Sequence, residues 1–303
     1  MPQFHTDDYF HIGHAHLTSG KPCQDYAFSG VCGKTAFAVV SDGCSTGRHT
    51  DIGSRVVALS AVSAVQRYSR ESKITPESLE NNTISTGIIE AQHYTMRGAR
   101  EMLSLELADM LATSNLVCLT PHGGFVHMHG DGVIASVHNN GFIELTSYEW
   151  NNNMPLYLAY TENASARLKF IQAHGGDLDA PALKSERWLY NPENSATDLQ
   201  AQEFLTLGEG IGGILKNISS EEMAELAFVA VFTDGVMQID GIDWKNAVIR
   251  LLAFKNINGE FAKRRMIRFI KETKEGGKKG PLDDIAYAVI RVAPDGPGGQ
   301  YGN

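Results

Sequence analysis

The segment Leu226-Ala-Phe-Val-Ala-Val-Phe-Thr-Asp234-Gly235 is a run of apolar residues that ends in an acidic turn. The same pattern occurs at Thr35-Ala-Phe-Ala-Val-Val-Ser-Asp42-Gly43 and at Phe125-Val-His-Met-His-Gly-Asp131-Gly132. A fourth acidic pair, Asp283-Asp284, opens the strand-like run Ile285–Val292. Short apolar runs bounded by turn residues are typical of buried strands. We therefore expect several strands that each begin or end at a carboxylate.

The acidic ends of these runs indicate a cation. A carboxylate removed from water at the end of a buried strand is unfavourable unless a positive group meets it. Several carboxylates that converge at one end of a sheet would also repel one another unless they share cations. Oxygen ligands beside glycine turns suit hard divalent ions such as Mg²⁺ and Mn²⁺. The sequence therefore predicts a divalent-metal site made of distant aspartates.

Composition and charge restrict the class of protein. The chain has 303 residues, of which 43% are hydrophobic and 20% charged, so it has enough apolar material for a sizeable core. Its formal net charge is −9. Because phosphate backbones favour basic surfaces, this charge argues against a nucleic-acid partner.

The expected location follows from what the sequence lacks. No apolar run approaches the ~20 residues of a membrane helix, so we expect no membrane partner. The first residues have neither the charged nor the apolar region of a signal peptide. The four cysteines show no Cys-x-x-Cys spacing, which is typical of reduced packing residues. We expect a cytoplasmic protein.

The order of the apolar patterns predicts the fold class. Helical spacing runs from about Asp51 to Arg70, and a second helical pattern runs from Thr75-Pro76 to about Leu107, with an interruption near Gly87. Strands with short turns follow over 115–137, and short turns join antiparallel strands. Helices grouped in sequence and separated by antiparallel strands predict an α+β layered sandwich.

The second half of the chain extends this pattern. Residues 148–225 are less regular, and we expect them to form an insert, or flap, that flanks the cleft of a single domain over 1–293. Two helices are expected at about 243–254 and 260–273, before the last strand. Residues 294–303 are expected to be a flexible tail.

Taken in order, the motifs resemble those of the PPM/PP2C family of metal-dependent protein Ser/Thr phosphatases, in particular its bacterial branch. The motifs that carry the resemblance are Gln24-Asp25, Asp42-Gly43, Gly130-Asp131-Gly132, Thr233-Asp234-Gly235 and Asp283-Asp284. One Asp-Gly is an ordinary turn, but five such motifs in this order are specific. The resemblance covers roughly residues 13–292. It implies a four-layer α/β/β/α sandwich with two mainly antiparallel sheets flanked by helices.

The resemblance also implies an activity and its cofactors. The chain would hold two or three Mg²⁺ or Mn²⁺ ions, and a hydroxide bridging two of them would hydrolyse phosphoserine or phosphothreonine in a protein substrate. The implied metal ligands are Asp42, Gly43, Asp234, Asp283, Asp131 and Asp25. Three of these, Asp42, Asp234 and Asp283, would be the catalytic set.

Each ligand has a distinct role by the same resemblance. Asp42 would bridge two ions, and the carbonyl of Gly43 would help to hold one of them. Asp234 and Asp283 would complete the other. Asp131 would belong to a weaker third site. The remaining ligand, Asp25, would hold metal-bound water, while Asp284 would have a supporting role.

The chain departs from the family at the substrate phosphate. Many members have an arginine shortly before the motif that Gln24-Asp25 matches, and here that segment contains no arginine. His16 or Lys21 could replace it, although lysine lacks the bidentate fork of arginine. Arg48, in the loop after Asp42, is a third candidate for the phosphate contact.

Two other functions remain open at this point. The segment His127-Met-His129-Gly-Asp131 copies most of a His-x-His-x-Asp-His zinc motif, and zinc accepts histidine and aspartate ligands. That alternative leaves Asp42, Asp234 and Asp283 without a role. The missing arginine motivates the other alternative, a catalytically weak phosphatase fold that binds a partner or regulates it.

Overall fold

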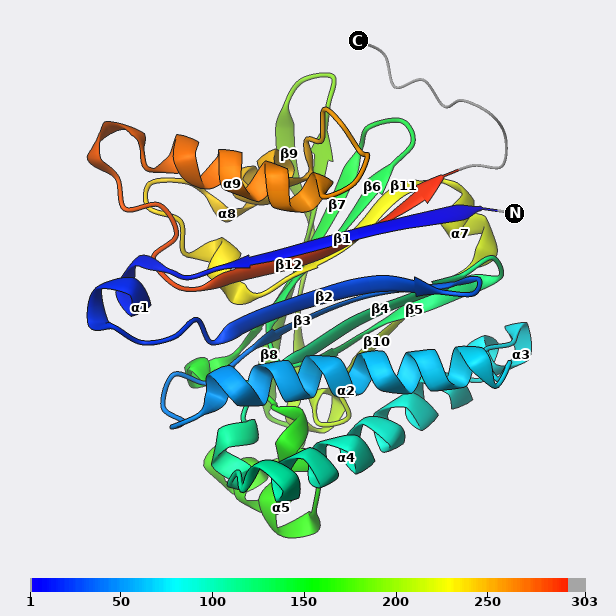
Figure 1. The fold of residues 1–303 in the computed structure, drawn as a ribbon, viewed down its shortest axis with the longest axis vertical. Coiled ribbons are helices and arrows are strands. Elements are labelled where there is room, and N and C mark those ends of the chain that lie inside the picture. Colours follow the sequence, from blue (N-terminus) through cyan, green and yellow to red (C-terminus); the bar gives the residue numbers. More distant parts are fainter. Residues whose placement is uncertain (1, 294–303) are drawn as a thin grey trace.

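Two antiparallel sheets pack face to face between two layers of helices (Figure 1). The computed structural model describes residues 2–293. The larger sheet has seven strands in the order β1-β12-β11-β6-β7-β8-β9, and the smaller has five in the order β10-β5-β4-β3-β2. The predicted four-layer α+β sandwich is confirmed. The expected tail at 294–303 lies outside the described residues.

The strands are as follows. Those of the larger sheet are β1 (Gln3–His11), β12 (Ile285–Ala293), β11 (Leu226–Phe232), β6 (Gly132–His138), β7 (Ile143–Trp150), β8 (Pro181–Asn191) and β9 (Ala196–Thr206). Those of the smaller sheet are β10 (Ile214–Ile218), β5 (Gly123–His129), β4 (Ser114–Thr120), β3 (Thr35–Asp42) and β2 (Asp25–Cys32). All strand pairs with a register in the described residues are antiparallel.

The helices lie mostly in two groups, one on each outer face. The α-helices are α1 (His14–Ser19), α2 (Thr50–Arg70), α3 (Pro76–Glu80), α4 (Thr83–Leu103), α5 (Ala164–Ala173), α6 (Leu207–Gly210), α7 (Ser220–Ala224), α8 (Trp244–Leu252) and α9 (Phe261–Thr273). Short 3-10 turns are η1 (Leu107–Met110), η2 (Asn151–Asn153), η3 (Leu158–Thr161), η4 (Asp234–Met237) and η5 (Glu275–Gly277). In Figure 1, α8 and α9 cover the larger sheet, and α2 and α4 cover the smaller one.

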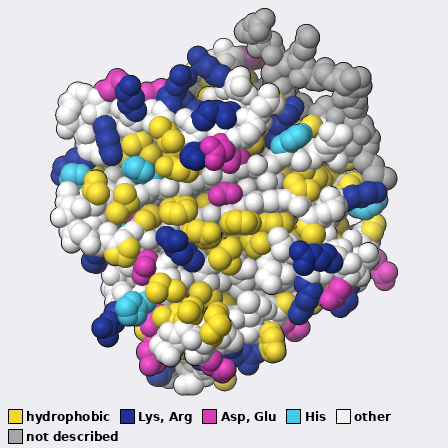
Figure 2. Space-filling model, in the orientation of Figure 1, with side chains coloured by type: hydrophobic (Ala, Val, Ile, Leu, Met, Phe, Trp, Pro, Cys, Tyr) yellow, Lys and Arg dark blue, Asp and Glu magenta, His cyan; other side chains and the backbone are white. Residues whose placement is uncertain are grey.

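Both faces of the central strands are buried, which explains their continuous apolar runs. In β11, Val229 and Val231 face the other sheet, while Ala230 and Phe232 pack against α8 and α9. The side chains of β3 alternate in the same way between the inter-sheet core and α2. Figure 2 shows hydrophobic side chains in a band between β1 and β2, where the inter-sheet layer reaches the surface.

One helix boundary was predicted wrongly. The second helical pattern breaks at Asn82, which has a left-handed φ of 59°, and not near Gly87. Gly87 lies inside α4, where a Cβ would come within 2.6 Å of the Tyr68 hydroxyl. This glycine therefore allows α4 to pack closely on α2, and it does not interrupt the helix.

Residues 148–225 are built into both sheets. They supply the β8–β9 hairpin at one edge of the larger sheet and β10 at an edge of the smaller one. The role of this stretch as a flap stays a prediction. At the opposite edge of the larger sheet, β1 pairs with β12 along its whole length.

Two further expectations concern the whole described chain. Among residues 2–293, no helix is both long enough and apolar enough to cross a membrane. The four cysteines are free thiols.

Candidate metal centre

The fold gathers the predicted carboxylates at one end of the sandwich. Strands β2 and β12 begin, and β3 and β11 end, on the side where α1 lies, at the left of Figure 1. Asp25 opens β2 and Asp42 closes β3, and the two residues are partners in the antiparallel register. Asp131 lies in the turn between β5 and β6, and Asp234 follows β11. Antiparallel pairing therefore brings together residues that are far apart in sequence.

Three glycines allow the backbone segments of this end to meet. A Cβ on Gly235 would lie 1.7 Å from the carbonyl oxygen of Asp284, and one on Gly13 would lie 2.1 Å from the carbonyl carbon of Asp283. A Cβ on Gly43 would lie 2.5 Å from the carbonyl oxygen of Thr50. No real side chain makes contacts this short, so Gly13 and the glycines after Asp42 and Asp234 are required for packing.

Asp25 is almost completely buried and is held from both sheets. Thr233 donates a 2.6 Å hydrogen bond from Oγ1 to Oδ2 of Asp25. Burial raises the pKa of Asp25 well above its usual range, and the nearby charge of Asp284 raises it further, although the Thr233 bond opposes this shift. The carboxyl groups of Asp25 and Asp42 are also in hydrogen-bond contact.

The other acidic groups repel one another in the same way. Burial raises the pKa of Asp42 well above its usual range, and the charges of Asp25, Asp234 and Asp131 add to the shift. Burial, then the charge of Asp234, raises the pKa of Asp131. For Asp234, burial and the charge of Asp283 raise the pKa to about 6. Protons or metal ions must therefore offset this concentration of negative charge.

The residues fit a hard cation. None of Asp25, Asp42, Asp131, Asp234 and Asp283 forms an ion pair with Lys or Arg within residues 2–293. Two buried side-chain oxygens at this end, Oδ1 of Asp131 and Oε1 of Gln24, have no hydrogen-bond partner in the described part of the chain. Unpartnered buried oxygens without a protein cation are the donors that Mg²⁺ or Mn²⁺, with their bound waters, accept.

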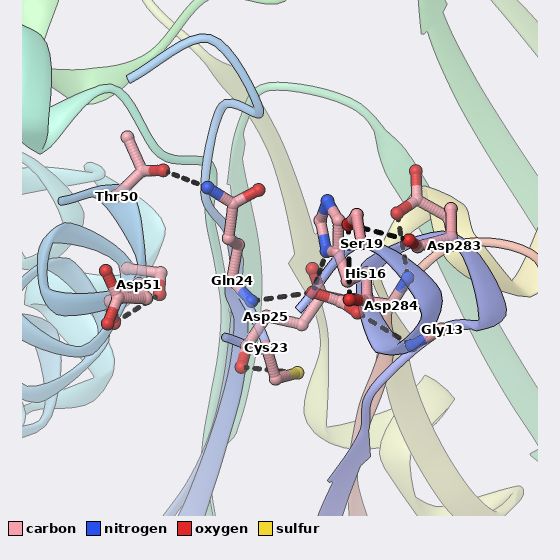
Figure 3. Close-up of polar contacts among 12 residues, drawn as sticks. Gly13, His16, Ser19, Cys23, Gln24, Asp25, Thr50, Asp51, Asp283 and Asp284 are labelled. Atoms are coloured by element: carbon pink, nitrogen blue, oxygen red, sulfur yellow. Dashed lines mark hydrogen bonds and ion pairs between the residues drawn. The ribbon is translucent and has the colours of Figure 1, made fainter. Parts of the chain in front are cut away.

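Asp284 is an anchor rather than an open ligand (Figure 3). Its Oδ1 accepts from the backbone N–H of Gly13 at 2.7 Å. Its Oδ2 accepts from the backbone N–H of Gln24 at 2.6 Å, and Nδ1 of His16 lies 2.8 Å away. Asp284 thus ties the whole N-terminal segment that carries Gln24-Asp25 to the start of β12. This is the supporting role expected for it, with partners that the sequence did not predict.

The tightest potential ligand group differs from the predicted catalytic set. Within residues 2–293, the only three His, Cys, Asp or Glu residues whose potential ligand atoms all lie within 4.8 Å of one another are His16, Asp283 and Asp284. Asp42, Asp234 and Asp283 do not form such a group. Asp234 and Asp283 instead share a long contact with Nε2 of Gln238, at 3.5 and 3.4 Å.

The three candidates for the substrate phosphate lie in different environments. Lys21 and Arg48 are exposed, in the loops that precede Asp25 and follow Asp42. His16 is buried, and its Nδ1 is bonded to Asp284. Lys21 and Arg48 are therefore accessible cations, whereas the imidazole of His16 is fixed by a carboxylate.

The zinc alternative has no support in the described part of the chain. His127 and His129 lie on β5 and face the helices, with their rings 4.5 Å apart. However, the potential ligand atoms of His127, His129 and Asp131 do not all lie within 4.8 Å of one another. The reason is the turn at Gly130, whose φ of 120° takes Asp131 out of the strand. Burial lowers the pKa of His127 to about 4, so this imidazole is a neutral core group.

Sequence reasoning missed two residues that shape the centre. Thr233 connects the two sheets through Asp25, and Gln238 touches both Asp234 and Asp283. Thr233 is part of the Thr233-Asp234-Gly235 motif, and that position was the available signal for its role. Gln238 carried none, because its contact depends on the 3-10 turn η4.

Comparison with known proteins identifies the family. The model of the protein phosphatase 2C family matches residues 12–271, so the chain belongs to this family. The match includes four of the proposed aspartates but ends before Asp283 and Asp284. No curated protein sequence matches the chain.

Solved structures share the fold at low sequence identity. The Ser/Thr phosphatase Stp1 of Staphylococcus aureus is 10% identical, with a TM-score of 0.54, over 97% of this chain and 96% of that one. A bacterial serine phosphatase is 11% identical, with a TM-score of 0.54, over 97% of this chain and 100% of its own. The Mycobacterium tuberculosis phosphatase PstP/Ppp is 12% identical, with a TM-score of 0.50, over 97% and 100% of the two chains. At this identity the likeness supports the fold alone.

Proposed function

We propose that this chain is a metal-dependent phosphatase that hydrolyses phosphoserine and phosphothreonine in proteins. Membership of the protein phosphatase 2C family supports the reaction class. The observation that carries the proposal is a set of mutually repelling aspartates, buried at Asp25 and Asp131 and partly buried at Asp42 and Asp234, that no lysine or arginine of residues 2–293 neutralises. A site that must offset so much negative charge is suited to binding divalent cations.

The proposed ligands are the residues that the sequence predicted. Asp42, with the carbonyl of Gly43, would hold the ions on the side of the smaller sheet. Asp234 and Asp283 would hold them on the side of the larger one, and Asp131 would serve a third ion. When bound, these Mg²⁺ or Mn²⁺ ions would supply positive charge that activates water and stabilises the phosphoryl oxygens.

The chain's own groups would then orient the reactants. Asp25, fixed by Thr233, would accept a hydrogen bond from the attacking water. The exposed cations Arg48 and Lys21 would contact the phosphate of the substrate protein, and His16 is the third candidate for this contact. A water and a phosphate held in line need no protein nucleophile.

The test is metal-dependent hydrolysis of a phosphothreonine peptide. We expect turnover with Mn²⁺ or Mg²⁺ that disappears in EDTA and in the Asp42→Asn and Asp234→Asn variants. Asp198→Asn is the matched control, because Asp198 is exposed on β9. Metal binding without turnover on any phosphoester would instead favour a binding or regulatory protein. Full activity in EDTA would contradict the proposal.

A further inference from the structure

His16 is locked in one orientation. Its Nδ1 lies 2.8 Å from Oδ2 of Asp284, and the imidazole is nearly buried, with 10% of the side chain exposed. An ionised carboxylate only accepts hydrogen bonds, so Nδ1 carries the hydrogen. Backbone N–H groups of Gly13 and Gln24 hold the same carboxylate in place. In the neutral imidazole this leaves the lone pair on Nε2.

The lone pair on Nε2 has no protein partner within residues 2–293, where the only hydrogen bond of the ring is the one from Nδ1. Asp283 is the third member of the group in which one potential ligand atom from each of His16, Asp283 and Asp284 lies within 4.8 Å of the others. Asp283 accepts from the backbone N–H of Asp284 through Oδ1, and within residues 2–293 its Oδ2 has only the long contact with Gln238. Both oxygens of Asp284 already have close hydrogen-bond partners. Nε2 of His16 and Oδ2 of Asp283 have none within residues 2–293, so these two atoms are the most available to a ligand.

We propose that Nε2 of His16 ligates the divalent ion that Asp283 holds, and that Asp284 is the positioning residue for this imidazole. The proposal rests on the proposed function, since it adds a nitrogen ligand to that metal centre. Histidines that bind metals commonly donate their other ring N–H to a carboxylate, which fixes the tautomer and raises the basicity of the ligand. The pair of His16 and Asp284 has this arrangement.

A nitrogen ligand would change which metal the centre prefers. Mg²⁺ takes oxygen ligands in a strict octahedron, whereas imidazole favours transition ions that lie higher in the Irving–Williams order. The chain would therefore select a first-row transition ion over Mg²⁺ more strongly than a site made of oxygen alone. The absence of the family's arginine from the same segment agrees with a different use of these residues.

The direct test is pulsed electron paramagnetic resonance of the full chain with Mn²⁺ as the probe. A nitrogen bonded to Mn²⁺ modulates the electron spin echo at ¹⁴N frequencies. We expect this modulation in the wild type and in His14→Gln, a control on the same helix, and its loss in His16→Gln. Titration calorimetry of the same proteins should show that His16→Gln lowers the ratio of Mn²⁺ to Mg²⁺ affinity by about tenfold.

Three results would overturn the inference in different ways. Bound Mn²⁺ without ¹⁴N modulation in the wild type would remove the nitrogen ligand but leave the proposed phosphatase intact. Modulation that persists in His16→Gln, together with weaker binding of inorganic phosphate, would make His16 a phosphate contact instead. No bound Mn²⁺ in any protein would contradict both proposals.

A second variant examines the positioning residue. Asp284→Asn keeps one oxygen acceptor, and we expect it to lower Mn²⁺ affinity by about 10- to 100-fold while the ¹⁴N modulation weakens. Unchanged affinity and modulation in a folded Asp284→Asn protein would contradict the positioning role. If circular dichroism shows that this variant is unfolded, the His16→Gln comparison still decides the ligand.

Discussion

The hydroxyl of Thr233 donates a 2.6 Å hydrogen bond to Oδ2 of Asp25, and this bond joins the end of the larger sheet to the start of β2 in the smaller one. Thr233 Oγ1 also accepts from the backbone N–H of Ala286 at 2.9 Å. One side chain therefore connects β11, β12 and β2 directly beside the proposed metal centre. Thr233 belongs to the Thr233-Asp234-Gly235 motif and also connects the two sheets at this end.

Replacing Thr233 with valine tests this connection. Thr233→Val keeps the shape but leaves Asp25 and the Ala286 N–H without their partner, and losing a buried partner costs about 1–3 kcal/mol. We expect a lower free energy of unfolding by that amount in urea titrations. Metal affinity should also fall, because the Thr233 bond opposes the rise in the pKa of Asp25. Thr233→Ser, which restores the hydroxyl, should recover most of both losses.

Asp131 should be separable from the other ligands. If it serves a third, weaker ion, Asp131→Ala will lower turnover of a phosphothreonine peptide while tight binding of the other ions, measured by calorimetry, remains. The variant should also unfold at a higher temperature in EDTA, since it removes a buried carboxylate whose Oδ1 has no partner. Collapse of tight metal binding in Asp131→Ala would show that this assignment is wrong.

The metal-free protein should lose stability as the pH rises. Asp25, Asp42, Asp131 and Asp234 have pKa values raised by burial and mutual repulsion, so the folded state keeps protons that the unfolded state releases. Their contribution to the free energy of unfolding is fully present below the unfolded pKa near 3.8 and is lost as the pH rises from there through the folded values, so the loss due to Asp234 is complete somewhat above its folded pKa of about 6.

Urea titrations in EDTA between pH 4 and 8 measure this loss. Asp234→Asn should flatten the dependence, and saturating Mn²⁺ should raise stability most at the alkaline end, where the carboxylates are ionised. The buried His127 acts in the opposite sense, because its pKa of about 4 removes stability as the pH falls below 6.5. The comparison is therefore made between wild type and variant at each pH. An identical slope in both would contradict the prediction.

The glycine after Asp234 should tolerate no side chain. Gly235→Ala would place a Cβ 1.7 Å from the carbonyl oxygen of Asp284, and such overpacking should cost about 3 kcal/mol by shifting the start of β12. Gly98→Ala is a control for which we expect the opposite change in stability. Gly98 lies in α4 with nothing within 4 Å, so alanine should stabilise the helix by about 0.5–1 kcal/mol. Thermal unfolding of the two variants would show these opposite shifts.

Much of the fold could be read from local patterns. The runs that end at Asp42 and Asp234 are buried strands, because burial on both faces leaves a continuous apolar signature. The helical spacing of 51–70 is α2. The break at Asn82 was missed, since a left-handed asparagine and an interior glycine carry similar turn signals. The hairpin β8–β9 was missed as part of the sheet because most of its residues are only half-buried or exposed, so they form no continuous apolar run.

The amino-acid sequence alone determined the family, the layer order and the aspartates whose negative charge a cation must offset. Residue type and order along the chain carry that information. Only the tertiary structure decided which partners those groups meet. Asp284 holds His16 and the turn before β2, and Thr233 crosses between sheets, through contacts between residues more than 200 positions apart. Such contacts depend on strand register and on close glycine packing, and no local pattern encodes them.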